Sequence, residues 1–509
     1  MSGTASNLRA RQVIAIDTEK QIGSFLFAIY ACLLVLIGFI AASDRIVHWF
    51  VIPVTLCGVV VGIDAFDWFR NKCDIFDPYG LTGVFGVFFF FLAPLLHVYW
   101  DRWLPYIVPP NDWREWLGYM ATLNLLGLMV YRFSRGVFLG RHYTPCRPWL
   151  LDERRFFFLG LSTLMVTAAA QILVYMSYGG IQGYIEAATN QDTLRTNMRY
   201  MGWIYSISES FPIIAMMMFG MYARDKPRYR SWAVLITVLV VYFLLKIFFG
   251  GLRGSRNNTI WGLIWGVGIL HIWVRPFSKP ILFAGLAFMI VFMYFYGFYK
   301  NAGLDSLQAF GSASNRSQLE QVTRRDTIGL ILGDLGRSDI QAFELYRILK
   351  PDSDYDLAYG RTYMVALMTP IPRSIIERPA TKTYEGSLVQ WGKGQFVPSD
   401  MEASNLYGLT GEAMLNFGPV VVPLMFVFLG LANGLVKRWR LRTSVPDARL
   451  LIYPFITIFC FYILACDLDN IIFDSTKNLL VPVALIVASL APAVRQEREA
   501  ARAQRPLHG

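Results

Sequence analysis

The sequence predicts an all-α protein that crosses a membrane about twelve times and carries one large, partly helical loop outside the bilayer. Of its 509 residues, 55% are hydrophobic and 16% are charged, and the mean hydropathy is +0.41, whereas about a quarter of a typical soluble domain is charged. Apolar runs of about 20 residues, long enough to cross a hydrocarbon core of about 30 Å, recur along the chain. The net charge of +11 does not indicate nucleic-acid binding, because the basic residues lie between the apolar runs.

The expected spans divide the chain into three segments. Spans one to nine occupy residues 1–299, a hydrophilic loop occupies 300–409, and spans ten to twelve with a tail occupy 410–509. No small-residue cleavage site follows the first span, so we expect it to remain as a signal anchor. The twelve spans are expected to begin near Gly23, Ile46, Gly80, Trp116, Phe156, Ser206, Ser231, Thr259, Pro280, Thr410, Leu450 and Asn478.

Basic residues indicate which side each loop faces. With the N-terminus inside, the inner segments hold 26 of the 47 Lys and Arg residues, and the short outer loops hold 8. Short loops rich in Lys and Arg stay in the cytoplasm. We therefore expect both termini to be cytoplasmic and the loop 300–409 to face the periplasm or the cell exterior. The basic inner loops are expected to contact anionic membrane lipid.

A few cations depart from this bias and form a candidate anion site. Arg195 and Arg199 are four residues apart, so both would project from one face of a helix. The next outer turn, 250–259, has three glycines that let the backbone approach a ligand, together with Arg253 and Arg256 at the start of a span. A helix N-terminus and arginine forks both suit phosphate. Lys246 lies about one turn below this site. The alternative is that these cations only reach outward to lipid headgroups.

Carboxylates at the same level supply candidates for a general base. Glu209 lies just inside the sixth span, Glu412 lies in the first turn of the tenth, and Asp467 and Asp469 end the eleventh. A base that activates a hydroxyl group must be a carboxylate, His or Tyr within reach, and outer histidines are scarce, so Glu412 is our candidate. Its alternative role is to complement the helix dipole, and the two aspartates would pair with outer arginines.

The long loop is expected to be partly helical. We expect helices at 316–327 and 338–350 and a short apolar helix at 361–369, followed by an irregular lid from Thr381 to Ser404. The Asp352-Ser353-Asp354 triplet is interpreted as a turn after a helix and not as a metal site. The six cysteines have no metal-ligand spacing and are expected to be free thiols. Neither a metal nor a cofactor is expected.

Several short motifs in the second half of the chain resemble a known family. They are Gly254-Ser255-Arg256, Pro370-Ile371-Pro372-Arg373, Arg378-Pro379 and the run from Gly411 to Gly418 that opens the tenth expected span. Their order, with a long outer loop between the first and second, resembles bacterial oligosaccharide repeat-unit polymerases, which include O-antigen and exopolysaccharide polymerases. The family usually has Lys where this chain has Arg378. The resemblance covers the chain from about Gly179 onward.

The resemblance implies a GT-C-like glycosyltransferase of polysaccharide biosynthesis in the bacterial inner membrane. Such an enzyme joins undecaprenyl-diphosphate-linked oligosaccharide units on the periplasmic face without a cofactor, and a chain-length regulator protein can be its partner. On this interpretation Glu412 is the base, and Arg253, Arg256 and Arg373 stabilise the departing diphosphate. The residues expected to bind the diphosphate or the glycan also include Arg195, Arg199, Lys246, Arg378 and Asn416.

Other functions remain open. An O-antigen ligase resembles this enzyme class, but those enzymes use a histidine in their large outer loop, and residues 300–409 contain none. A lipid-linked oligosaccharide flippase would need cations along a central cavity and two similar halves, whereas the expected spans contain almost no charges. A scaffold or channel gives no reason for the clustered outer charges.

Overall fold

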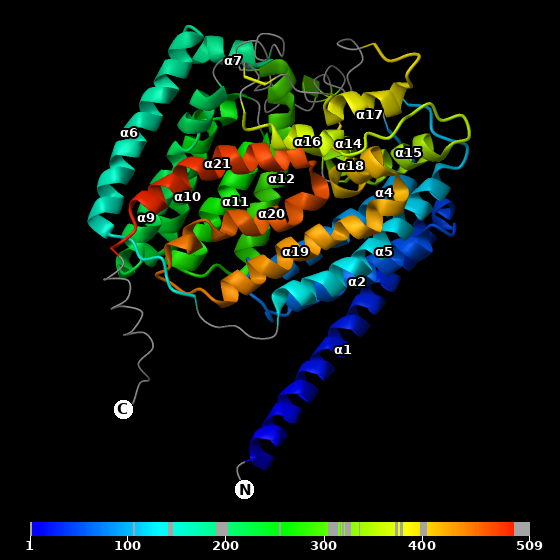
Figure 1. Cartoon of the computed structure of the whole chain (residues 1–509), viewed down its shortest axis with the longest axis horizontal. Helices are drawn as coiled ribbons and strands as arrows, with labels where there is room; N and C mark the ends of the chain where they lie inside the picture. Colours follow the sequence, from blue (N-terminus) through cyan, green and yellow to red (C-terminus); the bar gives the residue numbers. More distant parts are fainter. Residues whose placement is uncertain are drawn as a thin grey trace. The chain divides into compact units, whose positions relative to one another are not determined.

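The structure is a computed structural model of the chain. It describes the backbone of residues 3–492 except 105–106, 141–145, 190–201, 254–255, most of 304–326, 335, 372–374, 377–379 and 398–404, and it describes side chains from Ile22 onward. Helices supply the regular structure of these residues, which contain no β-strand beyond one isolated bridge between Leu151 and Leu490. The expectation of an all-α chain is therefore confirmed for this part of the protein (Figure 1).

The chain folds as two compact units, each made from segments that are distant in sequence. Unit 1 contains Met1–Arg141, Ile331–Arg438 and Phe459–Ile471, and unit 2 contains His142–Leu330, Trp439–Ile458 and Ile472–Gly509. The hydrophilic stretch 300–409 is thus shared between the units near residue 330. Helices α20 (Tyr453–Ala465) and α21 (Leu468–Ala488) contribute residues to both.

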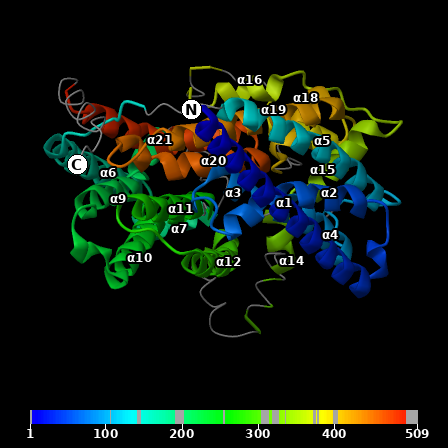
Figure 2. The same cartoon turned by 90° about the horizontal axis from the view of Figure 1, so that it is seen from below.

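Unit 1 is built around α2, α5 and α19, which lie side by side in Figure 1 and Figure 2. Its other helices include the short ones from the hydrophilic stretch. The bounds are α1 Gly3–Ala42, α2 Val51–Phe69, α3 Pro78–Val87, α4 Ala93–Tyr99, α5 Trp113–Leu139, α15 Ser338–Leu349, α16 Arg361–Leu367, α17 Lys382–Trp391, α18 Gly408–Phe417 and α19 Val422–Leu441. A π-helical turn, Phe88–Leu92, joins α3 to α4.

Unit 2 contains a group of adjacent helices formed by α9, α10 and α11 (Figure 2). The bounds are α6 Glu153–Ser177, α7 Ile181–Thr189, α9 Phe211–Ala223, α10 Trp232–Phe248, α11 Arg256–Trp273, α12 Lys279–Ala302 and α14 Thr327–Gly329. A 3-10 turn, Gly251–Arg253, connects α10 to α11.

Side-chain caps define where several of these helices begin. Asp77 accepts hydrogen bonds from the N–H groups of Tyr79 (3.0 Å) and Gly80 (3.1 Å) at the start of α3. Asp152 accepts one from the N–H of Arg155 (3.1 Å) at the start of α6. A carboxylate in this position satisfies an unpaired N–H group and suits the positive end of the helix dipole.

In the part of the chain that the structure describes, eight helices are long and apolar enough to cross a membrane. They are Ile22–Ala42, Val51–Phe69, Pro78–Tyr99, Glu153–Ser177, Gly202–Ala223, Lys279–Tyr299, Pro419–Leu441 and Leu468–Ala488. Two shorter apolar helices, Trp232–Phe248 and Tyr453–Ala465, accompany them. The structure thus supports a polytopic membrane protein, and the count of twelve spans stays a prediction.

The last spans begin at places that differ from those expected. The tenth was expected near Thr410, but the apolar helix begins at Pro419, and α18 before it is a separate short helix. Gly418 interrupts the run because its backbone adopts φ +78°, a conformation that glycine reaches without a Cβ clash. The twelfth span was expected near Asn478, yet α21 already begins at Leu468.

The expected irregular lid contains a helix. The passage from Thr381 to Ser404 was expected to lack regular structure, but α17 occupies Lys382–Trp391. Thr381 caps it through the N–H of Tyr384 (3.5 Å), and Gly392 ends it with φ +81°. Val389 is buried with Phe343 of α15 in one apolar cluster. Burial of this apolar face stabilises a segment whose Gly, Ser and Thr residues would otherwise favour a loop. The helices expected at 338–350 and 361–369 are found as α15 and α16.

Glycines and one ion pair hold the central helices of unit 1 together. A Cβ on Gly127 of α5 would lie 2.2 Å from the ring of Phe426, and one on Gly430 of α19 would lie 1.9 Å from Ser134 Oγ. Such close approach of backbones is typical of packed membrane helices. Arg135 of α5 also makes two hydrogen bonds, of 2.6 and 2.9 Å, to the carboxylate of Asp64 on α2.

We expect Gly418→Ala to lower the stability of unit 1 by about 1 kcal/mol, because alanine must adopt a left-handed backbone there. The nearest atom to the added Cβ, Leu357 Cδ1 at 3.7 Å, would not clash. Gly136→Ala is the matched control, since nothing lies within 4 Å of its Cβ and alanine favours the helix interior of α5 by about 0.5–1 kcal/mol. The midpoint of thermal unfolding, measured in detergent, should fall for Gly418→Ala and rise for Gly136→Ala. Shifts of both midpoints in the same direction would contradict this account.

Candidate functional site

The residues expected at the site fall into three groups in the structure. Arg195, Arg199, Arg373 and Arg378 lie outside the described residues. Arg256 begins α11, but its side chain is outside the described part. The others belong to two separate clusters: Lys246 and Arg253 to unit 2, and Glu412 and Asn416 to unit 1.

The cluster of unit 2 is centred on the carboxylate of Glu209. Arg253 Nη2 lies 2.9 Å from Glu209 Oε1, and the ammonium of Lys477 pairs with Glu209 Oε2. The amide of Asn258 donates a hydrogen bond of 2.7 Å to the same Oε2, and Lys246 Nζ donates one of 3.4 Å to Asn258 Oδ1. All five residues are buried, so we call them the Glu209 cluster.

The glycines before Arg253 are needed by this cluster. Gly250 adopts φ +154°, and a Cβ there would lie 2.6 Å from Asn258 Nδ2 and 2.9 Å from Glu209 Cδ. The sequence suggested that these glycines let the backbone approach a ligand. In the structure the backbone of Gly250 approaches the protein's own polar side chains. Arg253 is accordingly 9% exposed and already paired.

Basic side chains outnumber acidic ones in and beside the Glu209 cluster. Lys246, Arg253 and Lys477 lie around the carboxylate of Glu209, and the carboxylate of Asp474 also acts on Lys477. Burial alone would lower the pKa of Arg253, but the attraction of Glu209 outweighs it and raises that pKa, so Arg253 stays cationic. A buried group of this composition favours an anion as a further partner.

Sequence reasoning identified two of these three cations. Lys477 was assigned to a loop, because the twelfth span was expected to begin at the next residue. In the structure it lies inside α21 and is 5% exposed. A lysine within a predominantly apolar segment was the available signal, since such residues usually face other charged groups.

The cluster of unit 1 is centred on Glu412 in α18. The hydroxyl of Thr362 donates to Glu412 Oε1 (2.8 Å), and the N–H of Leu468 donates to Oε2 (2.7 Å). Asn416 donates from its amide to the carbonyl of Glu412 (2.7 Å) and accepts from the N–H of Gly360 (2.9 Å). Glu412 and Asn416 thus join α18 to the start of α16 and to the start of α21.

Asp467 holds the beginning of α18. Its Oδ1 accepts hydrogen bonds from the N–H groups of Tyr407 (2.9 Å) and Gly408 (2.8 Å), and its Oδ2 pairs with the ammonium of Lys382. The same ammonium lies 3.6 Å from Asp469. Burial would lower the pKa of Lys382, yet the attraction of Asp467 and then Asp469 raises it. Within the described residues the two aspartates pair with this lysine, whereas we expected them to pair with outer arginines.

The surroundings of Glu344 and Glu412, near Asp467, favour the neutral form of both carboxyl groups. Glu344 of α15 is fully buried, and its oxygens make no hydrogen bond that meets normal geometry within the described residues. Burial, and then the charges of Asp467 and Glu412, raise its pKa well above the ordinary value. Burial and the charge of Asp467 raise the pKa of Glu412 to about 8, against the opposing hydrogen bonds from Leu468 and Thr362. This group is therefore poised near neutral pH to accept or release a proton.

Comparison with protein-family models, with curated protein sequences and with solved structures finds no match to this chain.

Removal of Glu209 is expected to destabilise the protein strongly. In Glu209→Ala the cations Arg253 and Lys477 stay buried without their carboxylate, a loss that costs about 3–5 kcal/mol. Glu153→Ala is the control, because Glu153 is a 59% exposed partner of Arg224 and exposed pairs contribute about 0–1 kcal/mol. Thermal unfolding followed by tryptophan fluorescence measures both variants. Similar midpoints for the two would contradict the buried-pair interpretation.

The stability of unit 1 is expected to fall as pH rises from about 4.5 towards 8. The folded state binds the Glu412 proton more tightly than the unfolded state does, because its pKa rises from the ordinary 4.5 to about 8. Stability therefore decreases across this window and levels off above it. Each unit of pKa difference corresponds to about 1.4 kcal/mol. Thermal midpoints between pH 5 and 9 should show this slope in the wild type and a smaller one in Glu412→Gln.

The control for the pH experiment is Asp356→Asn. Asp356 is exposed, and its hydrogen bond from Lys393 lowers its pKa, so its replacement should leave the slope above pH 5 unchanged. A Glu412→Gln variant with the wild-type slope would show that the carboxyl of Glu412 does not titrate in this range.

Proposed function

We propose that this protein is a membrane-embedded glycosyltransferase that joins lipid-diphosphate-linked oligosaccharide units. The observation that carries the proposal is the group of three basic residues, Lys246, Arg253 and Lys477, buried around Glu209, because basic side chains bind the oxygens of a diphosphate. The resemblance of the motifs to oligosaccharide repeat-unit polymerases supplies the substrate class, undecaprenyl-diphosphate-linked oligosaccharide. The eight apolar helices are compatible with a substrate held in a membrane.

In the proposed reaction, a hydroxyl of the acceptor sugar attacks the anomeric carbon of the donor unit. The new C–O bond forms as the bond from that carbon to the diphosphate breaks, and the diphosphate leaves with the bonding electrons. Arg253, Lys246 and the expected Arg256 and Arg373 stabilise its charge. Glu412, with a pKa near 8, accepts the hydroxyl proton. The role of each residue is tested by a variant of that residue.

A direct test uses the purified full chain in lipid vesicles with a synthetic lipid-diphosphate repeat unit. We expect a ladder of polymer lengths on a gel. Glu412→Gln should reduce its formation by about 10²-fold or more, in the range that a general base contributes. Lys246→Met and Arg373→Ala should weaken substrate use. Arg228→Gln, in an exposed turn of unit 2, is the control. A wild-type ladder from Glu412→Gln, Arg256→Ala and Arg373→Ala alike would overturn the proposal.

Transport of the same lipid-linked substrate is a second candidate function. The sequence suggested that the spans contain almost no charges, which disfavoured a flippase. The structure instead buries Glu209, Lys246 and Lys477 together within apolar helices, and charged groups inside spans often mark a transport path. The vesicle experiment separates the two functions. Polymer requires the enzyme, whereas movement of single units between leaflets without any new glycosidic bond identifies a transporter.

A further inference from the structure

Unit 1 contains a large cavity at the end opposite to the α15 and α18 region. Its volume is about 590 Å³, and it lies where α1, α2, α3, α5 and α19 come together. Trp116 near the start of α5 packs against Tyr346 of α15, with ring centroids 5.3 Å apart, whereas Arg132 and Arg135 near the end of α5 line the cavity. At 1.5 Å per residue this part of α5 is about 28 Å long, close to the thickness of a hydrocarbon core.

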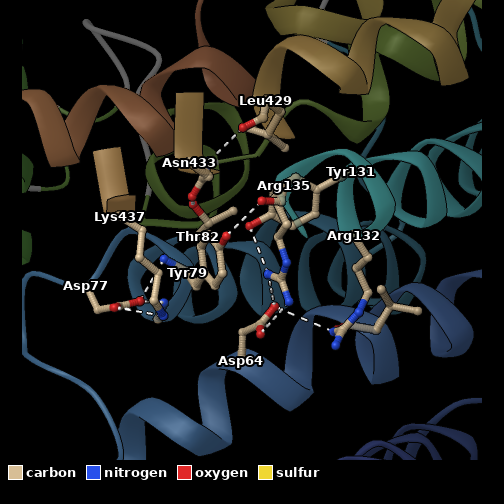
Figure 3. Close-up of polar contacts among 12 residues, drawn as sticks. Asp64, Asp77, Tyr79, Thr82, Tyr131, Arg132, Arg135, Leu429, Asn433 and Lys437 are labelled. Atoms are coloured by element: carbon tan, nitrogen blue, oxygen red, sulfur yellow. Dashed lines mark hydrogen bonds and ion pairs between the residues drawn. The ribbon is translucent and has the colours of Figure 1, made fainter. Parts of the chain in front are cut away.

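One wall of the cavity is a network of charged side chains. Figure 3 shows the carboxylate of Asp64 between the guanidinium groups of Arg135 (2.6 Å) and Arg132 (3.6 Å). Lys437 Nζ lies 3.0 Å from Asp77 and 4.2 Å from the ring centroid of Tyr79. These residues belong to four different helices and one loop, so the wall depends on the packing of the whole unit.

Positive charge exceeds negative charge on this wall by one. The cavity is lined by four cations, Lys72, Arg132, Arg135 and Lys437, and by three carboxylates, Asp64, Asp67 and Asp77. Arg135 is almost fully enclosed, whereas the side chains of Lys72, Arg132 and Lys437 are 24%, 31% and 23% exposed. The exposed cations can therefore contact a ligand while Arg135 and Asp64 hold the helices in place. A ligand with one negative charge would balance the wall.

The opposite wall is apolar and belongs to a membrane-spanning helix. Ile22 and Phe25 of α1 line the cavity and are 52% and 45% exposed. Most of the apolar span Ile22–Ala42 is not covered by the rest of the protein. Ser24 Oγ accepts a hydrogen bond of 2.8 Å from Lys72 Nζ, which fixes α1 beside the charged wall. The cavity thus has one charged side and one lipid-facing side. It lies beside the beginning of the apolar span Ile22–Ala42 and near the end of α5.

We propose that this cavity binds the phosphodiester headgroup of a glycerophospholipid. The single negative charge of a phosphodiester matches the excess charge, and Arg132 and Lys437 are the exposed cations placed to contact its oxygens. The acyl chains would lie along Ile22 and Phe25 of α1. The basic residues around the cavity belong to segments that we expect to be cytoplasmic, so the ligand comes from the inner leaflet. This site is independent of the proposed glycosyl transfer.

The test measures lipid retained by the purified full chain with native mass spectrometry, after exchange into phosphatidylglycerol and phosphatidylethanolamine vesicles. We expect the double variant Arg132→Gln, Lys437→Gln to retain lipid at least about tenfold less, because both charge-assisted hydrogen bonds to the phosphodiester are lost. Ile63→Trp, which fills the cavity without a change of charge, should also reduce retention. Lys350→Gln with Lys393→Gln is the matched control, because these two lysines lie in the hydrophilic stretch 300–409 and pair with exposed aspartates.

Two results would overturn the proposal. One is wild-type lipid retention by both the double variant and Ile63→Trp when their thermal midpoints equal that of the wild type. The other is that the protein binds soluble glycerophosphoethanolamine as tightly as it binds phosphatidylethanolamine. The acyl chains would then contribute nothing, and the ligand would be a free phosphodiester. If the double variant unfolds, the folded Ile63→Trp variant decides the question by itself. Loss of retention in Ile63→Trp with retention in the control supports the site.

Discussion

The carboxylate of Asp467 holds together the helices that the hydrophilic stretch contributes to unit 1. Its two oxygens accept the backbone N–H groups that begin α18 and the ammonium of Lys382 at the start of α17. One residue therefore fixes three segments that are far apart in sequence. A buried charge must be satisfied from several directions at once, so each partner restricts where the others can lie. The helices of the hydrophilic stretch gain their positions in this way.

The charge of Asp467 also affects the protonation of two neighbouring carboxyl groups, those of Glu344 and Glu412. Lys382 and two backbone N–H groups contact the carboxylate of Asp467. Burial, and then the charge of Asp467, raise the pKa of Glu344 and of Glu412. In unit 2, three basic residues lie around Glu209, and Asp474 also acts on Lys477. Acidic side chains therefore predominate in the buried group of unit 1, and basic side chains predominate in that of unit 2.

A third group of charges, around Asp64 and Arg135, differs because it borders open space. The Asp64–Arg135 pair is enclosed and bidentate, which suits a structural role, whereas Arg132 and Lys437 beside it are partly exposed. The enclosed pair holds two helices together. The exposed cations beside it face the cavity and are free of that structural role. Buried pairs and exposed pairs contribute very differently to stability, so this division lets the exposed cations engage a ligand at little cost to the fold.

The sequence alone determined the class of protein, its helical content and several helix boundaries. Hydropathy and helical periodicity act within one or two turns, so the apolar spans, α15 and α16 could be predicted from neighbouring residues. The sequence analysis missed α17, because its apolar face is buried against α15, which is distant in sequence. Only the tertiary structure decided which charges meet. Glu209 reaches Lys477, Asp64 reaches Arg135, and Glu412 reaches the N–H of Leu468 through the packing of helices distant in sequence. No local sequence pattern predicts how these distant helices pack. For the same reason, Arg253 and Asn416 looked like free ligand-binding residues in the sequence, while in the fold each is engaged with another helix.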